Sequence, residues 1–169
     1  AAITSDADEI HKATKLVLPG VGAFEDAIGE LHRLHLVGPI LDIINEGKPF
    51  LGICLGLQLL FETSYENGTH RGLGVLPGDV VKFEIPRDYS VPHMGWNELE
   101  IRRRPPFLEG IPDRAYVYFV HSYYVVPHDT AIVATETDYG VRFCSTVWRD
   151  NVIACQFHPE KSQTDGLRM

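Results

Sequence analysis

Cysteine is scarce in this sequence, and the three present, Cys54, Cys144 and Cys155, form no cluster. An odd number of cysteines cannot all pair in disulfides, and none of these spacings is typical of a zinc site. Free thiols persist in reducing compartments. The sequence therefore predicts a cytoplasmic protein with no metal site.

Long hydrophobic runs and an excess of positive charge are also absent. No apolar run reaches the ~20 residues that a membrane helix needs. The net charge of −8 disfavours nucleic acid or an anionic membrane as the main partner. A chain of 169 residues with 44% hydrophobic and 22% charged residues has the composition of an ordinary globular protein. We therefore expect one domain spanning residues 1–169.

The first half of the chain alternates strand and helix patterns. Expected strands lie at residues 1–4, 15–18 and 50–53, and expected helices follow a cap near Ser5 or Asp6 and lie at residues 24–31 and 39–45. Such alternation favours a parallel sheet with helices on both faces. Sites in such sheets lie at the carboxyl ends of the strands.

The second half is rich in turns and strands. Expected strands lie at residues 80–85, 114–126, 131–135, 141–148 and 152–157. The whole pattern predicts a three-layer α/β fold, whose mostly parallel central sheet carries an antiparallel extension.

The most informative segment is Phe50-Leu-Gly-Ile-Cys54-Leu-Gly56, an apolar strand that leads into a helix. Gly52 and Gly56 flank Cys54 at a spacing of two, as in a nucleophile elbow with cysteine in place of serine. The sharp turn strains the nucleophile's backbone, and the glycines avoid clashes with the adjoining strand and helix. At a helix N-terminus, aligned amide dipoles favour the thiolate. Cys54 is therefore the candidate nucleophile.

A second segment, Gln156-Phe-His158-Pro-Glu160, supplies a candidate base. On an extended segment, residues two apart share a face, so His158 and Glu160 can form an imidazole–carboxylate pair. Together with Cys54 they predict a cysteine hydrolase or transferase.

Acyl transfer also requires donors for the developing oxyanion. The amide of Leu55, directly after the nucleophile, is one candidate. The loop Gly20-Val21-Gly22, at the end of a nearby expected strand, is a candidate source of the second.

The two segments resemble the signature of class I (triad) glutamine amidotransferases, which have a flavodoxin-like three-layer fold. Further stretches resemble more narrowly the glutaminase subunit of imidazole glycerol phosphate synthase. These are Pro19–Phe24, Val91–Asn97, Tyr118–Tyr123, Asp138–Gly140 and Gln156–Gln163.

The resemblance implies a thioester mechanism without a cofactor. Cys54 would attack the glutamine carboxamide, His158 would move the proton, and Glu160 would orient His158. Gln58, Thr137 and Tyr139 would hold the main-chain groups of glutamine.

It also implies a partner. Ammonia would pass into a (β/α)8-barrel cyclase subunit, giving a heterodimer that makes imidazole glycerol phosphate and aminoimidazole carboxamide ribotide in histidine biosynthesis. Residues expected near that interface are Trp96, Tyr118, His121 and Lys161. The residues alone are equally consistent with His121 as a buried histidine of the core.

The ends depart from the family pattern. An N-terminal strand with its glycine- and asparagine-rich turn and the following helix are expected to be missing. The C-terminal helix after Met169 is also expected to be missing, and residues 166–169 are expected to form only its first turn. An unpaired row of backbone groups is then expected between the strands at 15–18 and 50–53, or beside one of them.

Three alternatives remain open. A glutaminase subunit of another class I amidotransferase would share the elbow and His158-Pro-Glu160, but is not expected to carry Pro92-His-Met-Gly-Trp-Asn97. A free-standing γ-glutamyl thiol hydrolase would work without a partner. A catalytically silent interaction subunit would be expected to lack the cysteine.

Overall fold

The structure is a computed structural model that describes all residues, 1–169. Its helices are α1 (Ala7–Lys12), α2 (Phe24–Arg33), α3 (Val37–Asn45), α4 (Leu55–Gln58) and α5 (Gln163–Arg168), with 3-10 helices η1 (Pro106–Leu108), η2 (Thr130–Ile132) and η3 (Pro159–Lys161). Asp6 caps α1 by accepting from the N–H groups of Asp8 and Glu9, which confirms the expected start of this helix.

The strands are β1 (Leu16–Gly20), β2 (Phe50–Cys54), β3 (Phe61–Ser64), β4 (His70–Arg71), β5 (Leu76–Lys82), β6 (His93–Glu98), β7 (Glu100–Ile101), β8 (Tyr116–His121), β9 (Tyr123–Pro127), β10 (Val133–Asp138), β11 (Arg142–Arg149) and β12 (Val152–Cys155). Ten of them form one sheet in the order β1-β2-β12-β11-β9-β5-β3-β4, with β10 on β11 and β7 on β10. The parallel part is β1-β2-β12, and most of the remaining pairings are antiparallel. This is the α/β fold with an antiparallel extension that the sequence predicts.

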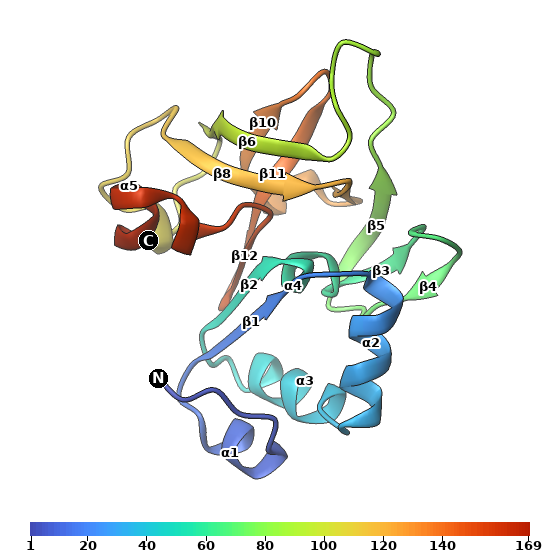
Figure 1. Cartoon of the computed structure of the whole chain (residues 1–169). Coiled ribbons are helices and arrows are strands. Elements are labelled where there is room, and N and C mark those ends of the chain that lie inside the picture. The colour runs from blue at the N-terminus through green and yellow to red at the C-terminus, as the bar shows by residue number, and fades with distance from the viewer.

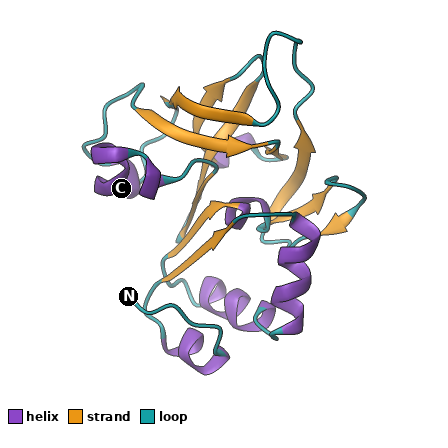
Figure 2. Cartoon of the chain, in the orientation of Figure 1, coloured by secondary structure: helices purple, strands orange, loops and turns teal.

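Three layers result, because residues of the sheet alternate between two cores. Ala154 packs with α1, α2 and α3 in the larger core, whereas the next residue, Cys155, packs in a core that includes Phe119 and Phe157. Figures 1 and 2 show α1, α2 and α3 gathered at one end of the molecule and β6, β8 and α5 at the other, with β1, β2 and β12 between them. The second face is therefore covered mainly by the β6–β8 pair rather than by helices.

Two sequence expectations are corrected, and one strand was not predicted. Residues 1–4 form no strand, because no neighbouring strand pairs with them. The expected strand at 114–126 is two strands, β8 and β9, which belong to different sheets and part at Ser122. The stretch His93–Glu98 is strand β6, which antiparallel pairing with β8 stabilises.

The open backbone edge lies outside β1. β1 and β2 pair directly, from Leu16 with Phe50 to Gly20 with Cys54, so no gap separates them. β1 is the terminal strand of the sheet, and Val17 on it is half exposed. The expected unpaired backbone groups therefore lie beside β1 and not between β1 and β2.

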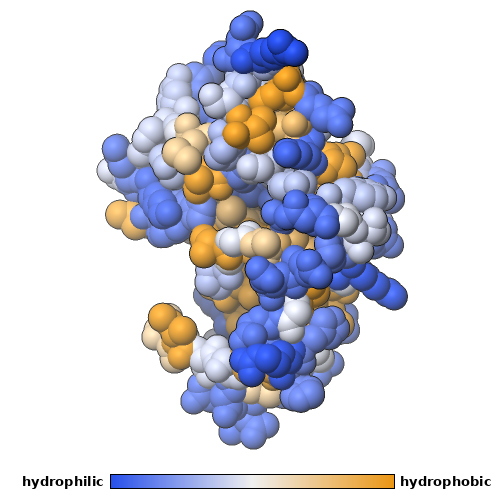
Figure 3. Space-filling view, turned by 45° about the vertical axis from the view of Figure 1, so that its right-hand side comes forward, coloured by the Kyte–Doolittle hydropathy of each residue, from blue (hydrophilic) through white to orange (hydrophobic).

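One face of the molecule is largely polar. Figure 3 shows a mostly hydrophilic face, on which hydrophobic residues gather in small separate groups. None of the helices has the length and hydrophobicity that crossing a membrane requires.

Candidate active site

Cys54 lies at a strained turn between β2 and α4. Its backbone has φ 54° and ψ −108°, a conformation that side chains with a Cβ rarely adopt. A Cβ on Gly56 would lie 1.9 Å from the carbonyl oxygen of Leu18, and one on Gly52 would lie 2.9 Å from the Cβ of Ala154. Gly56 is therefore required because the start of α4 lies close to β1, and Gly52 is required because β2 lies close to β12.

The resting nucleophile is a thiol. Burial raises the pKa of Cys54 to about 11, and hydrogen bonds from the Leu55 N–H and the Gln156 amide only partly offset it. The expected stabilisation of a thiolate by the helix is too weak, because α4 has only four residues, Leu55–Gln58. A base is therefore needed to take the proton when Cys54 reacts.

His158 is held in one orientation. Its Nδ1 lies 2.8 Å from Oε1 of Glu160, so the expected imidazole–carboxylate contact is present. The segment is not extended, since η3 begins directly after His158. The other ring nitrogen, Nε2, is buried and has no hydrogen-bond partner. Nε2 is thus the nitrogen free to exchange a proton.

Strand β8 fixes the backbone of His158. The His158 N–H donates to the carbonyl of Tyr118 at 2.9 Å. Ser162 completes the attachment: its hydroxyl donates to the His158 carbonyl at 2.6 Å and accepts from the Tyr118 N–H at 3.0 Å. The histidine therefore depends on β8 for its position, although some forty residues separate them in the chain.

A cavity of about 270 Å³ joins these groups. Its lining comes from the elbow with α4, the loop after β1, the turn after β3, β8, the start of β9 and the residue before η3: Val21, Gly22, Cys54, Leu55, Gln58, Glu66, Val120, His121, Tyr123 and His158. The predicted nucleophile, base and oxyanion loop thus meet in one pocket. A larger hollow of about 590 Å³, lined by Trp96 and residues of α5 among others, contains none of them.

The loop after β1 offers free donors to this pocket. The N–H groups of Val21 and Gly22 donate no hydrogen bond within the chain. Gly22 has φ +96°, and Gly20 packs so closely on the elbow that a Cβ there would lie 2.9 Å from the Cβ of Leu55. The next turn is anchored by Glu66, which accepts from the Phe24 N–H at 2.7 Å.

Two buried glutamines lie behind the nucleophile. The Gln58 amide nitrogen donates to the Tyr123 carbonyl at 3.0 Å and to Oε1 of Gln156 at 3.1 Å. Nε2 of Gln156 in turn donates to the Cys54 sulfur at 3.5 Å. Both N–H groups of Gln58 are therefore occupied, and only its oxygen remains free for a ligand.

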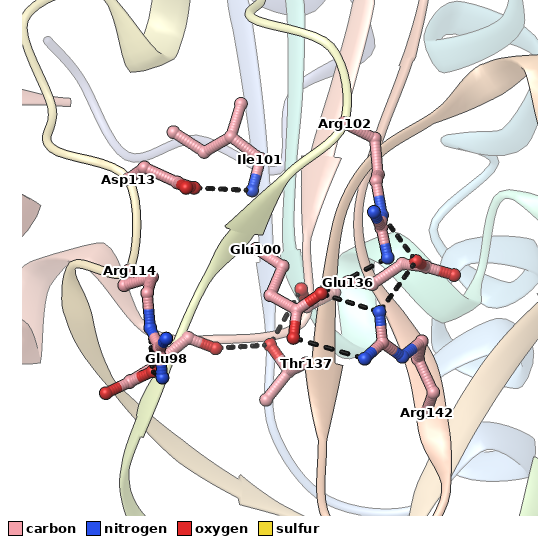
Figure 4. A network of polar contacts seen from close by, with 10 residues as sticks. Glu98, Glu100, Ile101, Arg102, Asp113, Arg114, Glu136, Thr137 and Arg142 are labelled. Atoms are coloured by element: carbon pink, nitrogen blue, oxygen red, sulfur yellow. Dashed lines mark hydrogen bonds and ion pairs between the residues drawn. The ribbon is translucent and has the colours of Figure 1, made fainter.

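The structure does not bring Thr137 or Tyr139 to the pocket lining. Thr137 is fully buried in the sheet, where its hydroxyl donates to the carbonyl of Glu98 (Figure 4). It also contacts the hydroxyl of Ser145. The Tyr139 hydroxyl donates to the carbonyl of Ser90, and its ring stacks on His93. Both side chains are engaged elsewhere, so neither is retained as a substrate ligand.

The residues expected at an interface divide into two groups. Trp96 is 44% exposed and packs edge-on against Tyr118 on the β6–β8 pair, and Lys161 is exposed. His121 is only 6% exposed. It hydrogen-bonds to the Tyr123 carbonyl and to His93, which makes it a buried residue of the pocket wall.

Sequence reasoning missed Glu66, which lines the pocket, and Gln156, which donates to the Cys54 sulfur. Gln156 lies two residues before His158, and the period of two in an extended segment was a usable signal that both face the same side. Glu66 follows β3 in a turn, where no local pattern indicates which way the carboxylate points.

The match to a family decides the class. Residues 2–168 match the family described as Glutamine amidotransferase class-I. This chain belongs to that family. The family assignment agrees with the buried nucleophile at a strained elbow and with the histidine–carboxylate pair beside it.

Curated members of the family include close relatives of this chain. The imidazole glycerol phosphate synthase subunit HisH of Rhodopirellula baltica is 59% identical over 169 residues, which are 100% of this chain and 82% of that protein. The subunit of the same name from Aquifex aeolicus is 54% identical over 167 residues, 99% of this chain and 80% of that protein.

Solved structures share the fold of this chain. A crystal structure of a glutamine amidotransferase has a TM-score of 0.71 at 19% identity, covering 97% of this chain and 80% of that one. The PurLQS structure from Thermotoga maritima has a TM-score of 0.68 at 19% identity, covering 92% of this chain and 75% of that one. The α/β arrangement around the elbow is therefore the class-I glutamine amidotransferase fold.

Proposed function

We propose that this chain is the glutaminase subunit of an imidazole glycerol phosphate synthase, acting in histidine biosynthesis. The observation that carries the proposal is the pocket that joins Cys54, His158 and the loop of Val21 and Gly22, in a chain 59% identical to a subunit with that name. The substrate is glutamine and the products are glutamate and ammonia.

The reaction begins with proton transfer from the buried Cys54 thiol to Nε2 of His158. The sulfur attacks the side-chain carbonyl carbon of glutamine, and the C–N bond breaks as His158 returns the proton to the leaving ammonia. Water then hydrolyses the thioester with His158 as base, which regenerates the thiol and releases glutamate. Glu160 holds Nδ1 of His158 and stabilises the imidazolium that forms at each step.

The oxyanion of each tetrahedral intermediate would be bound by backbone donors. The Leu55 N–H, on the residue directly after the nucleophile, would be one of them. The free N–H groups of Val21 and Gly22 supply the second donor, from the loop that begins at Gly20. A single donor of this kind is worth roughly 3–4 kcal/mol of barrier. Because Val21 is 78% exposed, a docked partner can reach and reposition this loop.

The α-amino and α-carboxyl groups of glutamine need polar partners in the pocket. The carboxylate of Glu66 lines it and can receive the ammonium group. The free oxygen of Gln58 is a second acceptor on the same wall. These two residues replace Thr137 and Tyr139 in the proposal.

Ammonia would pass to a (β/α)8-barrel cyclase subunit without release to solvent. The exposed Trp96, which packs against the half-buried Tyr118, and Lys161 nearby on η3 support docking on the β6–β8 side of the chain. Tryptophan and tyrosine are among the residue types that dominate interface energetics. The three buried, unpaired thiols fit the reducing cytoplasm, which is the setting we propose.

The test is a reconstituted assay with purified cyclase subunit, its nucleotide substrate, and either glutamine or an ammonium salt. We expect imidazole glycerol phosphate to form from glutamine only when this chain is present, and glutamate to appear in equal amount. The ammonium salt serves as the control, because the cyclase then works alone. Glutamine-dependent synthesis that is no faster with the chain than without it would overturn the proposal.

A further inference from the structure

A line of buried hydrogen bonds ends at the sulfur of Cys54. It runs from the Tyr123 carbonyl to the Gln58 amide, from there to the Gln156 amide, and on to the sulfur. Gln58 is 5% exposed and Gln156 is fully buried, so water does not compete for these groups. Gln156 takes no part in the proton transfers of the proposed reaction.

The carbonyl at the start of the line fixes the direction of every bond in it. A carbonyl oxygen only accepts, so the Gln58 atom facing Tyr123 must be the amide nitrogen. That nitrogen also faces Gln156, which must therefore present its oxygen, at 3.1 Å. The opposite end of the Gln156 amide is then the nitrogen, and this end lies 3.5 Å from the Cys54 sulfur. The orientation follows from the donors and acceptors around the amides, not from an arbitrary choice of flip.

A second contact holds the same carbonyl in place. Nδ1 of His121 lies 2.8 Å from the Tyr123 oxygen, so this nitrogen carries the proton in the neutral imidazole. Burial lowers the pKa of His121 to about 3, which keeps the ring neutral at physiological pH. Two donors thus converge on the carbonyl that orients Gln58, and none of these groups can turn without losing a buried hydrogen bond.

We infer that Gln156 is a further catalytic residue of the glutaminase, which stabilises the Cys54 thiolate by donating its side-chain N–H to the sulfur. Gln58 is its positioning residue, acting through the Gln156 amide. A thiolate accepts hydrogen bonds more strongly than a thiol, so the bond strengthens when His158 takes the proton. The inference rests on the proposed glutaminase function.

The test measures thiol reactivity, which needs neither substrate nor partner. The rate at which iodoacetamide alkylates Cys54 is followed from pH 7 to pH 10, and peptide mass spectrometry separates Cys54 from Cys144 and Cys155. Iodoacetamide reacts with the thiolate, so below the pKa the rate reports the thiolate fraction. The variants are Gln156→Met, which removes the donor at similar size, and Gln156→Glu, which places an acceptor against the sulfur.

We expect alkylation to slow by about tenfold in Gln156→Met, which corresponds to a pKa higher by about one unit, and by more in Gln156→Glu. The matched control is Thr135→Val, which removes an equally buried polar group from the hydroxyl cluster with Ser145 and Thr146. Its alkylation rate is expected to match that of the wild-type chain. Folded Gln156 variants with the wild-type rate at every pH would overturn the inference.

A third variant covers the case in which neither Gln156 variant folds. Gln58→Leu leaves Gln156 in place but removes the group that orients its amide. Alkylation is then expected to slow by about threefold, and an unchanged rate overturns the inference. Failure of the reconstituted assay would instead count against the proposed function, because the alkylation rates do not depend on turnover.

Discussion

At the scale of single residues, Cys54 carries both the proposed chemistry and a conformational strain. Its φ of 54° is a conformation that costs roughly 1–3 kcal/mol for a residue with a Cβ. The strain points the sulfur into the pocket with His158 and Leu55. A substitution of Cys54 that relieves this strain is therefore expected to stabilise the fold while it removes the nucleophile.

Replacement of Cys54 tests both effects. Cys54→Ala is expected to lower glutamine hydrolysis about 10³-fold or more, because no thioester can form, while synthesis from ammonium salt with the cyclase subunit continues. Cys54→Gly is expected to unfold at a higher temperature than Cys54→Ala, since glycine adopts the positive φ without strain. The measurements are glutamate release and thermal unfolding by circular dichroism. Residual glutaminase activity above a trace in Cys54→Ala would show that another group is the nucleophile.

At the scale of elements, the elbow depends on close approach of β1 to α4. Gly56→Ala would place a Cβ 1.9 Å from the Leu18 carbonyl, so β1 must move. We expect the free energy of unfolding, measured by urea denaturation, to fall by roughly 1–3 kcal/mol. Glutaminase activity, measured by the assay, is expected to fall by a factor that corresponds to the same free energy or more. Gly29→Ala on α2 is the control, because a Cβ there meets no atom within 4 Å. It is expected to stabilise the helix by up to ~1 kcal/mol.

The β6–β8 pair carries the proposed docking surface and also holds His158 through Tyr118. Trp96→Ala is expected to weaken cyclase binding about thirtyfold or more, since truncation of a hot-spot tryptophan costs ~2 kcal/mol or more, with little change in thermal stability. Isothermal titration calorimetry with the cyclase subunit gives the affinity. The control is Val126→Ala on β9, where the side chain has a similar exposure of 41% but belongs to the other sheet. Equal affinities in both variants would place the docking surface elsewhere.

At the scale of the whole molecule, two buried histidines make stability depend on pH. Burial lowers the pKa of His93 to about 4 and that of His121 to about 3. In the unfolded chain both titrate near pH ~6.5, so below that pH the unfolded state binds more protons than the native state. Their contribution to stability is present above pH ~6.5 and is lost as the pH falls toward the folded values.

We therefore expect the free energy of unfolding to fall between pH 7 and pH 5, by at most roughly 1.4 kcal/mol per pH unit for each histidine. Urea denaturation at several pH values measures the slope. The double variant His93→Gln/His121→Gln removes both titrating groups, and its slope should be distinctly shallower. A slope as steep as that of the wild-type chain would assign the pH dependence to other groups.

Sequence alone determined the features whose causes lie within a few residues. The spacing of Gly52, Cys54 and Gly56 specifies an elbow because the steric conflict is local. Phe24, Ile28 and Leu31 specify the buried face of α2 by their helical period. The contact of His158 with Glu160 likewise spans two residues.

Tertiary structure decided what depends on segments far apart in the chain. Gln156 reaches Cys54 across 102 residues and Gln58 across 98, and only sheet topology brings these side chains together. Thr137 turns away from the pocket because its hydroxyl bonds to β6 and β11, and His121 is buried because His93 pairs with it across β6 and β8. The high pKa of the thiol has the same origin. Desolvation depends on how many atoms surround the sulfur, and no local sequence pattern encodes that quantity.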